Sequence, residues 1–327
     1  MGIKIIGTGS YVPEKILTNF DLEKIVDTSD EWIRSRTGMV ERRIARDDET
    51  TSDMGTEAAK RALEMANVAP EEIDLIVVGT ITPDMHLPTT ACIIQNKLKV
   101  GIATCFDFQA ACTGFIYGIE IVNALMKNNR SLKKALLIGT EKLSSVTDWN
   151  DRNTCVLFGD AAGAVVFSKT LEPEDSVLSS VLHADGRNGD ILTIPGGGCL
   201  NPIKADNIND SLHCIRMEGN KVFKLAVNAM VGACKEALDL AHLSYSEISW
   251  LIPHQANMRI IKAIGSRLDI PIEKVCINIE KYGNTSACTI MLALDELVRS
   301  GKVNKGDRVL VTAFGGGMTW GAAVLKW

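Results

Sequence analysis

The sequence predicts an α/β fold built from two similar halves. Apolar runs with the length of buried strands alternate with longer segments of helical periodicity, a pattern typical of buried strands covered by helices. The same rhythm occurs twice along the 327 residues, and three segments of the second half resemble segments of the first in the same order. This ordered resemblance indicates an internal duplication.

The first half is predicted to alternate strands and helices without a long interruption. The strands are short and apolar, whereas the helices are longer and periodic. The expected elements are, in chain order, the strand IDLIVVGT, the helix TTACIIQNKLK, the strand GIATCFDF, the helix TGFIYGIEIVNALMKN and the strand KALLIGTE.

Three segments of the second half repeat this arrangement. EEIDLIVVGT at 71–80 resembles SEISWLIPHQ at 246–255, and KKALLIGTE at 133–141 resembles GDRVLVTAFGG. Each copy then reaches a Gly/Ala-rich strand, GDAAGAVVF in the first half and GMTWGAAVLKW in the second. The identities are few, but their common order favours duplication over coincidence.

A polar, Pro-containing stretch, SKTLEPEDS at 168–176, marks the expected seam. We therefore predict an N-terminal half of residues 1–172 and a C-terminal half of residues 173–327. Just beyond the seam, residues 183–210 are rich in Gly, Asn, Asp and Pro. This composition is typical of a long surface excursion, which in a compact enzyme often covers a binding site.

Composition and charge restrict the class of protein. The chain is 46% hydrophobic, so at this length it buries a substantial core. Its net charge of -5 argues against nucleic acid or an anionic membrane as a partner. The first apolar run is too short for a signal-peptide core or a membrane span, so we expect a soluble, cytoplasmic protein.

The nine cysteines are an odd number without a C-x-x-C pair, which fits a reducing compartment. Most lie among apolar residues, where cysteine acts as a small hydrophobe. None of the five histidines has the spacing of a zinc site, and GTGS near the N-terminus lacks the third glycine of a dinucleotide fingerprint. We therefore expect neither a metal nor a cofactor.

Cys112, in FDFQAACTGF, differs in its expected position. It follows the strand GIATCFDF and precedes a helix that opens at Thr113 and Gly114. A helix N-terminus offers unpaired N–H groups and a partial positive charge, which favour thiolate over thiol. Small neighbours would let a substrate approach. Cys112 is thus a candidate nucleophile, with core packing as the alternative.

Three other places carry candidate groups. His254 in PHQAN follows the strand SWLI and precedes a helix that opens at 257–258, on the sheet edge where sites form. Asn284 in GNTS precedes a Thr/Ser cap and the helix ACTIMLALDELVRS. The glycines of FGGGMTWGAA, at 314–323, could aim backbone N–H groups at a ligand oxygen. The alternatives are a structural histidine, a turn asparagine and a plain hairpin.

Together these motifs resemble the beta-ketoacyl-acyl-carrier-protein synthase III family, the thiolase-fold condensing enzymes that start fatty-acid synthesis. The resemblance spans nearly the whole chain and implies a five-layered α-β-α-β-α fold of two duplicated halves, usually a homodimer. The matching segments are, in order, GTGSYVPE, DEWIRSRTGMVERRIA, AACTGF, GDAAGAVV, MEGNKVFKLAV, HQANMRII, YGNTSA and FGGGMTWGA.

The resemblance implies a role for each candidate residue. Cys112 is expected to accept the acyl group from acyl-CoA, and His254 with Asn284 to serve decarboxylation of malonyl-acyl carrier protein. The backbone N–H groups of Cys112 and Gly316 are expected to form the oxyanion hole. The product would be a 3-oxoacyl-acyl carrier protein, and the other eight cysteines are predicted to be dispensable for acyl transfer.

The family pattern also points to residues for CoA. Trp32, Arg36 and Arg152 offer an aromatic ring and two cations, which suit an adenine ring and phosphates. Ordinary helix packing of Trp32 is the alternative.

For the acyl carrier protein, Arg259, Lys262 and Arg267 lie in a window without acidic residues, and the first two share a helix face. A solvated surface is the alternative, but an acidic carrier protein would fit this stripe. Leu87 occupies a place where some relatives carry phenylalanine, at a position that the family contributes to the partner subunit's acyl pocket. A smaller side chain there could admit a longer or branched primer.

Two other functions stay open. A priming ketosynthase of a polyketide or other specialised pathway would use the same three residues with a different starter or acceptor. A non-catalytic acyl-binding homologue is disfavoured, because it would not need Cys112, His254 and Asn284 together.

Overall fold

Two main sheets organise the chain, which a computed structural model describes over residues 2–327. The first sheet has the strand order β1 (Gly2–Tyr11), β7 (Ala161–Thr170), β6 (Lys134–Glu141), β4 (Leu75–Gly79) and β5 (Thr104–Phe108). The second has the order β8 (Val177–Ala184), β13 (Thr319–Lys326), β12 (Arg308–Gly315) and β11 (Trp250–Pro253).

The two sheets repeat one topology. In each, the first two neighbouring pairs are antiparallel and the next pair is parallel, so β8, β13, β12 and β11 correspond to β1, β7, β6 and β4. A parallel bridge between Leu251 and Val275 stands where β5 pairs with β4 in the first sheet. The duplication predicted from the sequence is therefore present in the strand order.

A loop between β7 and β8 separates the strands of the two main sheets. β7 ends at Thr170 and β8 begins at Val177, and each main sheet takes all its strands from one side of this loop. We propose on this basis the division into residues 1–172 and 173–327.

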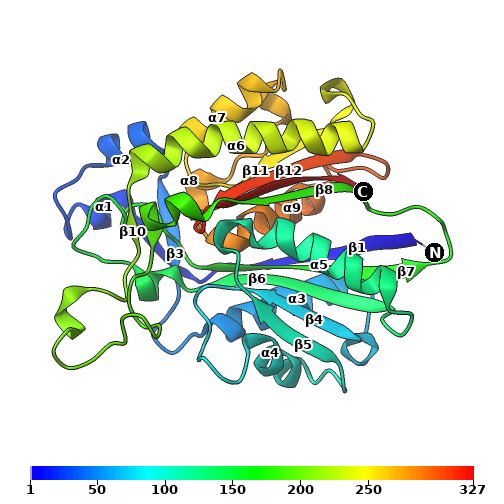
Figure 1. Ribbon diagram of the computed structural model, residues 1–327, viewed down its shortest axis with the longest axis horizontal. Coiled ribbons are helices and arrows are strands. Elements are labelled where there is room, and N and C mark those ends of the chain that lie inside the picture. Colours follow the sequence, from blue (N-terminus) through cyan, green and yellow to red (C-terminus); the bar gives the residue numbers. More distant parts are fainter. Residues whose placement is uncertain (1) are drawn as a thin grey trace.

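Five layers stack in the order helix, sheet, helix, sheet, helix (Figure 1). α3 (Thr51–Ala66) and α4 (Thr90–Leu98) cover the outer face of the first sheet. α5 (Gly114–Asn128) and α9 (Thr289–Arg299) lie between the sheets. α6 (Gly219–Leu240) and α7 (Met258–Arg267) cover the second sheet from outside. This is the five-layered fold implied by the family resemblance.

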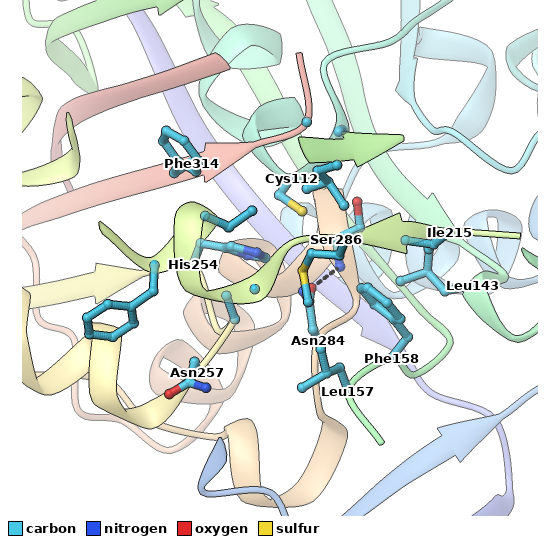
Figure 2. A pocket seen from close by; sticks show the side chains of 18 of the residues that line it. Cys112, Leu143, Leu157, Phe158, Ile215, His254, Asn257, Asn284, Ser286 and Phe314 are labelled. Atoms are coloured by element: carbon cyan, nitrogen blue, oxygen red, sulfur yellow. Dashed lines mark hydrogen bonds between the residues drawn. The ribbon is translucent and has the colours of Figure 1, made fainter. Parts of the chain in front are cut away.

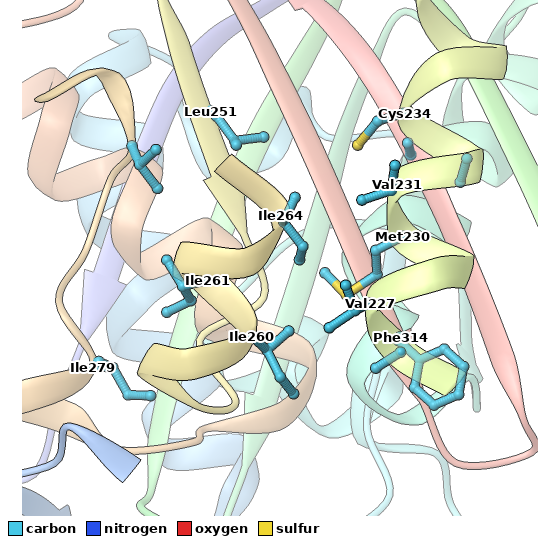
Figure 3. Packing of buried hydrophobic residues seen from close by; sticks show 14 of the residues in the cluster. Val227, Met230, Val231, Cys234, Leu251, Ile260, Ile261, Ile264, Ile279 and Phe314 are labelled. Atoms are coloured by element: carbon cyan, nitrogen blue, oxygen red, sulfur yellow. The ribbon is translucent and has the colours of Figure 1, made fainter. Parts of the chain in front are cut away.

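Strand periodicity explains the layers. Leu75 and Val77 of β4 join the core around α5 and α9, whereas Ile76 and Val78 point the other way, to α3 and α4. Both faces of each sheet are therefore apolar, as the continuous apolar runs predicted. Figure 3 shows the outer core of the second half, where α6 and α7 pack on the sheet through the residues Val227, Met230, Val231, Ile260, Ile261 and Ile264.

Smaller elements connect the main strands and helices. α1 (Asn19–Leu22) and α2 (Asp30–Thr37) lie between the paired strands β2 (Lys15–Thr18) and β3 (Glu41–Ile44) in sequence. β9 (Leu192–Thr193) pairs with β10 (Arg216–Met217), and α8 is Ile279–Tyr282. Short 3-10 segments are η1 (Pro70–Glu72), η2 (Ala111–Thr113), η3 (Leu143–Val146), η4 (Gly186–Ile191), η5 (Ile208–Asp210), η6 (Tyr245–Glu247), η7 (Ile272–Lys274) and η8 (Ser286–Cys288).

One predicted helix start is wrong. The Thr/Ser pair of GNTS does not cap α9, because Ser286–Cys288 forms the 3-10 turn η8 and the helix begins only at Thr289, with Cys288 as its N-cap. The 3-10 turn changes the direction of the chain before the helix begins.

The cysteines are all free, and five of them are buried. Cys92 and Cys199 are exposed, so a packing role does not extend to these two. Within residues 2–327, no helix is long and apolar enough to cross a membrane, and no group of three His, Cys, Asp or Glu side chains is placed to hold a metal ion.

Candidate active site

A cavity of about 770 Å³ lies between the two halves. Its wall includes Cys112 from the first half and His254 and Asn284 from the second (Figure 2). Gly316 of the second half also lines it. Cys112, His254 and Gly316 follow the strands β5, β11 and β12, whereas Asn284 lies between α8 and η8. The fold thus brings together the candidate residues that the sequence places up to about two hundred residues apart.

Cys112 lies in η2, directly before α5, at the strand-to-helix junction predicted from the sequence. Ala111 adopts a left-handed backbone conformation, with φ 44°, which turns the chain sharply between β5 and the helix. Gly315 packs against this turn, since a Cβ there would lie 2.8 Å from the Cys112 nitrogen. A glycine at 315 therefore permits the close approach of β12 to the cysteine.

Burial acts against the thiolate form that the helix N-terminus was expected to favour at Cys112. Burial raises the pKa of Cys112 to about 12, and the Glu141 carboxylate adds to the effect, while the nearby Ser286 hydroxyl acts against it. Desolvation disfavours the charged form of the thiol. At neutral pH the sulfur carries its proton.

His254 follows the last residue of β11 and is only 2% exposed. Its backbone N–H donates to the Thr312 carbonyl of β12, and its Nδ1 lies 2.7 Å from the Thr289 hydroxyl at the start of α9. Burial lowers the pKa of His254 to about 3. The imidazole is therefore neutral at physiological pH, and the Thr289 contact sets its ring orientation.

Asn284 is oriented by its own turn. Gly283 has φ 63°, and the Asn284 N–H donates to the Leu157 carbonyl at 2.8 Å. The Asn284 Oδ1 accepts a hydrogen bond from the Ser286 N–H at 2.9 Å. Because the amide oxygen is engaged in this way, the amide NH₂ is the group left to donate into the cavity.

A buried arginine packs against the turn that carries Asn284. Arg42 is fully buried, and it donates to the Val156 carbonyl at 2.7 Å and to the Asn19 side chain at 2.9 Å. A Cβ at Gly283 would lie 3.5 Å from the Arg42 Cβ. Burial lowers the pKa of Arg42 to about 10, so the side chain is still charged at neutral pH.

The residues predicted for CoA lie together at the exposed end of the cavity. Trp32 and Arg36, one turn apart on α2, both line it, and Arg36 is exposed. Arg152 does not line the cavity, but its guanidinium lies 5.3 Å from the centre of the Trp32 ring. The three side chains lie together at this end of the cavity.

The basic residues of α7 are exposed. Arg259 also lines the cavity and lies over the Phe223 ring at 5.3 Å. Lys262 is one turn further along the helix, whereas Arg267 donates to the Asn228 side chain at 2.5 Å. The stripe therefore runs from the cavity opening outward.

Gly316 and Leu87 differ in their relation to the cavity. Gly316 lines it, in the turn between β12 and β13. Leu87 does not line the cavity of its own chain and is 83% exposed. An exposed leucine is compatible with a contact to a partner subunit, which stays a prediction.

The excursion predicted over residues 183–210 forms part of the cavity wall. Gly189, Leu192, Thr193 and Ile194 line it, and β9 within the excursion pairs with β10 just beyond it. The segment thus contains a short strand, and its residues 189–194 contribute to the cavity wall.

Two residues of the site were missed at the level of the sequence. Glu141 is fully buried at the end of β6, and Ser286 is 2% exposed and lines the cavity. An acidic residue that ends the apolar run KALLIGTE, and a serine in the same motif as Asn284, were the available signals. Neither signal shows by itself that both residues lie near Cys112.

The cavity between the two duplicated halves is faced by a thiol, a neutral imidazole and a carboxamide. This combination defines the class as a condensing enzyme of the thiolase fold. Comparison with known proteins identifies the family. The family model of 3-oxoacyl-[acyl-carrier-protein (ACP)] synthase III matches residues 106–186, and the model of its C-terminal part matches residues 238–327.

Relatives resemble the chain over its full length. The beta-ketoacyl-[acyl-carrier-protein] synthase III of Caldanaerobacter subterraneus subsp. tengcongensis is 52% identical over 323 residues, which cover 99% of this chain and 97% of the relative. That of Aquifex aeolicus is 50% identical over 327 residues, with both chains fully covered. The chain belongs to the 3-oxoacyl-[acyl-carrier-protein] synthase III family.

Solved structures agree with this assignment. The crystal structure of 3-oxoacyl-[acyl-carrier-protein] synthase III from Aquifex aeolicus matches with a TM-score of 0.92 at 50% identity and covers both chains fully. The priming beta-ketosynthase of the R1128 polyketide pathway also has a TM-score of 0.92, at 35% identity, with 99% of this chain and 96% of that chain covered.

Proposed function

We propose that the protein condenses an acyl-CoA primer with malonyl-acyl carrier protein and releases CoA, CO₂ and a 3-oxoacyl-acyl carrier protein. The observation that carries this proposal is the common cavity of Cys112, His254 and Asn284, with a neutral histidine and an amide NH₂ free to donate. A redox-neutral condensation of this kind needs no cofactor, because acyl-CoA is itself a substrate.

In the first half-reaction, the Cys112 sulfur attacks the thioester carbonyl of acyl-CoA. The backbone N–H groups of Cys112 and Gly316 hold the developing oxyanion, CoA leaves, and the acyl group stays on the sulfur. The position of Gly316 in the cavity wall supports this role. Trp32, Arg36 and Arg152 hold the nucleotide end of CoA.

In the second half-reaction, malonyl-acyl carrier protein enters and loses CO₂. His254 and Asn284 donate hydrogen bonds to its thioester oxygen as enolate charge develops, and the carbanion then attacks the acyl-Cys112 carbonyl. If the Thr289 hydroxyl donates to Nδ1, the His254 proton lies on Nε2, which is the arrangement that this step needs.

The carrier protein docks on Arg259, Lys262 and Arg267, and its negative charge complements this stripe. A homodimer would place the exposed Leu87 of one subunit at the acyl pocket of the other. Leu87 is smaller than phenylalanine, so the pocket would admit primers longer than acetyl or branched primers.

Intact-mass measurement tests whether the protein is an enzyme that forms an acyl intermediate. The protein incubated with acyl-CoA is expected to gain the mass of one acyl group, and the Cys112→Ser variant is expected to gain none under the same conditions. A protein that forms no adduct with any acyl-CoA would be a non-catalytic homologue.

A panel of acyl-CoA primers, each assayed with malonyl-acyl carrier protein, tests the substrates. We expect isobutyryl and longer primers to compete with acetyl-CoA. The similarity to a priming ketosynthase favours one alternative: rejection of the carrier protein of fatty-acid synthesis, with adduct formation intact, would assign the enzyme to a specialised pathway. Strict preference for acetyl-CoA would contradict the proposed role of Leu87.

A further inference from the structure

The first half-reaction lacks an evident base. Burial raises the pKa of Cys112 to about 12, so its proton has to be removed before or during attack. His254 is a poor acceptor, because burial lowers its pKa to about 3. A different group must take the proton if the thiol is to react at neutral pH.

A buried carboxyl group stands behind the cysteine. Glu141 is fully buried at the end of β6, and its carboxylate accepts hydrogen bonds from three donors of one turn. The Thr82 hydroxyl donates at 2.7 Å, the Ile81 N–H at 3.1 Å and the Thr80 hydroxyl at 3.2 Å. These bonds hold the carboxylate in place, without a salt bridge to any cation among the described residues.

β6 brings this carboxyl group against the turn that follows Asn284. A Cβ at Gly139, two residues before Glu141 on the same face of β6, would lie 3.0 Å from the Ala287 carbonyl in η8. A Cβ at Gly114, directly after η2, would lie 2.8 Å from the Ala287 Cβ. η8 is therefore packed between β6 and the turn that carries Cys112.

Ser286 is the polar residue of η8 at this place. Its hydroxyl is buried and makes no hydrogen bond within the part of the chain that the structure describes. The residue has φ 51°, a left-handed conformation, and its N–H is held by the Asn284 side chain. Figure 2 shows Ser286 beside Cys112. A buried hydroxyl without a partner needs a reason, because it costs about 1–3 kcal/mol.

The side chains of Cys112, Ser286 and Glu141 lie close enough to affect pKa values within the group. The Ser286 hydroxyl is close enough to Cys112 and to Glu141 to lower the pKa of both, and the Glu141 carboxylate raises the pKa of Cys112. Burial raises the pKa of Glu141 to about 7. At neutral pH a large fraction of Glu141 is therefore ionised and able to accept a proton.

We propose that Ser286 and Glu141 form a proton relay that deprotonates Cys112 when the acyl group is transferred. The relay rests on the proposed function, since it serves the acylation step. In this relay Ser286 accepts the proton of the reacting sulfur, and Glu141 acts through Ser286.

The step balances without an oxidant or a reductant. The Cys112 S–H proton moves to the Ser286 oxygen as the Ser286 O–H proton moves to Glu141, and the sulfur forms a bond to the acyl carbon. The bond between that carbon and the CoA sulfur breaks. The relay then returns the proton to the departing CoA thiolate, which leaves as the free thiol.

The surroundings of Glu141 contain few groups that could disturb its titration. The titratable groups that face it are Cys112 from η2 and Cys288 from η8, and burial raises the pKa of both. Both thiols are uncharged at neutral pH. The turn from Thr80 to Thr82 offers only hydroxyl and backbone donors, and the Lys142 ammonium points away, to the carbonyls of Arg46, Asp47 and Glu49.

The test is the rate of acyl-Cys112 formation as a function of pH, followed by rapid quenching and intact-mass measurement. In the wild-type protein the rate is expected to rise with pH and to level off with a midpoint at about 7, the pKa of Glu141. Glu141→Gln is expected to lower the rate by about 10²- to 10⁴-fold. Its rate should keep rising above neutral pH, because hydroxide alone then removes the thiol proton.

Four further variants separate the relay from a structural role. Ser286→Ala and Ser286→Gly should lose acylation to the same extent, although glycine adopts the backbone conformation of residue 286 more easily. Thr82→Val keeps the carboxyl group but removes one donor to it, so the midpoint should move to higher pH. Asp160→Asn, a matched loss of a fully buried carboxylate outside the cavity, should leave midpoint and rate unchanged.

The outcomes are distinguishable. A wild-type protein that is never acylated would contradict the proposed function itself. The relay alone would be overturned if Glu141→Gln or Thr82→Val is acylated normally with an unchanged midpoint of the pH profile. It would also be overturned if His254→Gln loses that midpoint. If Glu141→Gln does not fold, the Ser286 and Thr82 variants still decide the question.

Discussion

Burial sets the protonation states of the two ionisable groups in the proposed reaction. Desolvation disfavours the charged form of each group, so Cys112 keeps its proton and His254 does not take one. A neutral histidine donates a hydrogen bond without supplying charge, which suits an enolate that forms and disappears within one turnover. The proton of Cys112 then needs its own acceptor.

The histidine leads to a prediction about stability. The pKa of His254 is lowered from 6.5 to about 3 on folding, so the unfolded chain binds a proton that the folded chain rejects between these values. The free energy of unfolding should therefore fall as the pH drops below 6.5, by about 2 kcal/mol at about pH 5. Urea unfolding at about pH 5 and pH 7.5 measures this change.

Two variants isolate the contribution of His254. His254→Gln should show a smaller loss of unfolding free energy over the same pH range. His242→Asn serves as the control, because residue 242 is exposed with φ 53°, a conformation that asparagine tolerates. Equal pH dependence in all three proteins would mean that His254 is not buried in its neutral form.

Asn284 allows the two half-reactions to be separated. Asn284→Asp keeps an acceptor for the Ser286 N–H but removes the amide NH₂ that faces the cavity. We expect acyl-Cys112 to form at nearly the wild-type rate, while condensation falls by about 10²- to 10³-fold, as for the loss of one oxyanion donor. Parallel mass and product assays measure both steps, and an equal loss in both would argue against a donor role in decarboxylation alone.

At the scale of elements, the duplication places two similar turns against each other. η2 precedes α5 and η8 precedes α9, and each turn contains one residue with positive φ, Ala111 at 44° and Ser286 at 51°. By this correspondence Cys112 matches Ala287. One copy of the turn thus carries the nucleophile, and the other carries Ser286 beside it.

The contact of β12 with η2 gives a prediction for Gly315→Ala. The added Cβ would lie 2.8 Å from the Cys112 nitrogen and 3.1 Å from its Cβ, and backbone atoms cannot yield as a flexible side chain does. We expect a loss of about 1–3 kcal/mol in unfolding free energy and a large drop in acylation rate. Urea unfolding and the mass assay measure the two effects.

Gly232→Ala is the matched control for this substitution. Residue 232 lies within α6, and a Cβ there would meet no atom within 4 Å. Alanine should stabilise the helix by about 0.5–1 kcal/mol and leave acylation unchanged. Equal behaviour of the two variants would show that the close approach at Gly315 does not matter.

At the scale of the whole molecule, positive charge gathers at the cavity although the chain has a net charge of -5. Arg36 and Arg259 line the cavity and are exposed, and Lys262 continues the stripe along α7. Both proposed substrates carry negative charge outside their acyl groups. Local charge rather than net charge therefore sets which partners approach this face.

Lys262→Glu tests this face without touching the cavity. We expect KM for malonyl-acyl carrier protein to rise by about tenfold, the effect of 1.4 kcal/mol, because the variant replaces an attraction by a repulsion. The rate of acyl-Cys112 formation should not change. Lys235→Glu, at an exposed position of α6, is the control, and an equal effect of both variants would indicate a non-specific charge effect.

Much of the architecture was predictable from local pattern. Strand and helix periodicity placed β4, β5, β6, α4 and α5 in the correct order, because an apolar run with flanking turns has few alternative structures. The start of α9 was predicted too early. Thr285 and Ser286 have the composition of a cap, but packing between β6 and η2 forces Ser286 into a left-handed turn instead.

The sequence by itself determined the duplicated α/β pattern and, through its motifs, the family and three candidate residues in its cavity wall. Only the tertiary structure decided their chemical state. Burial depends on residues brought from both halves, and it made Cys112 a thiol, His254 neutral and Glu141 a carboxyl group with a pKa of about 7. Such shifts arise from desolvation and from neighbours distant in the chain, and neither can be read from spacing along it.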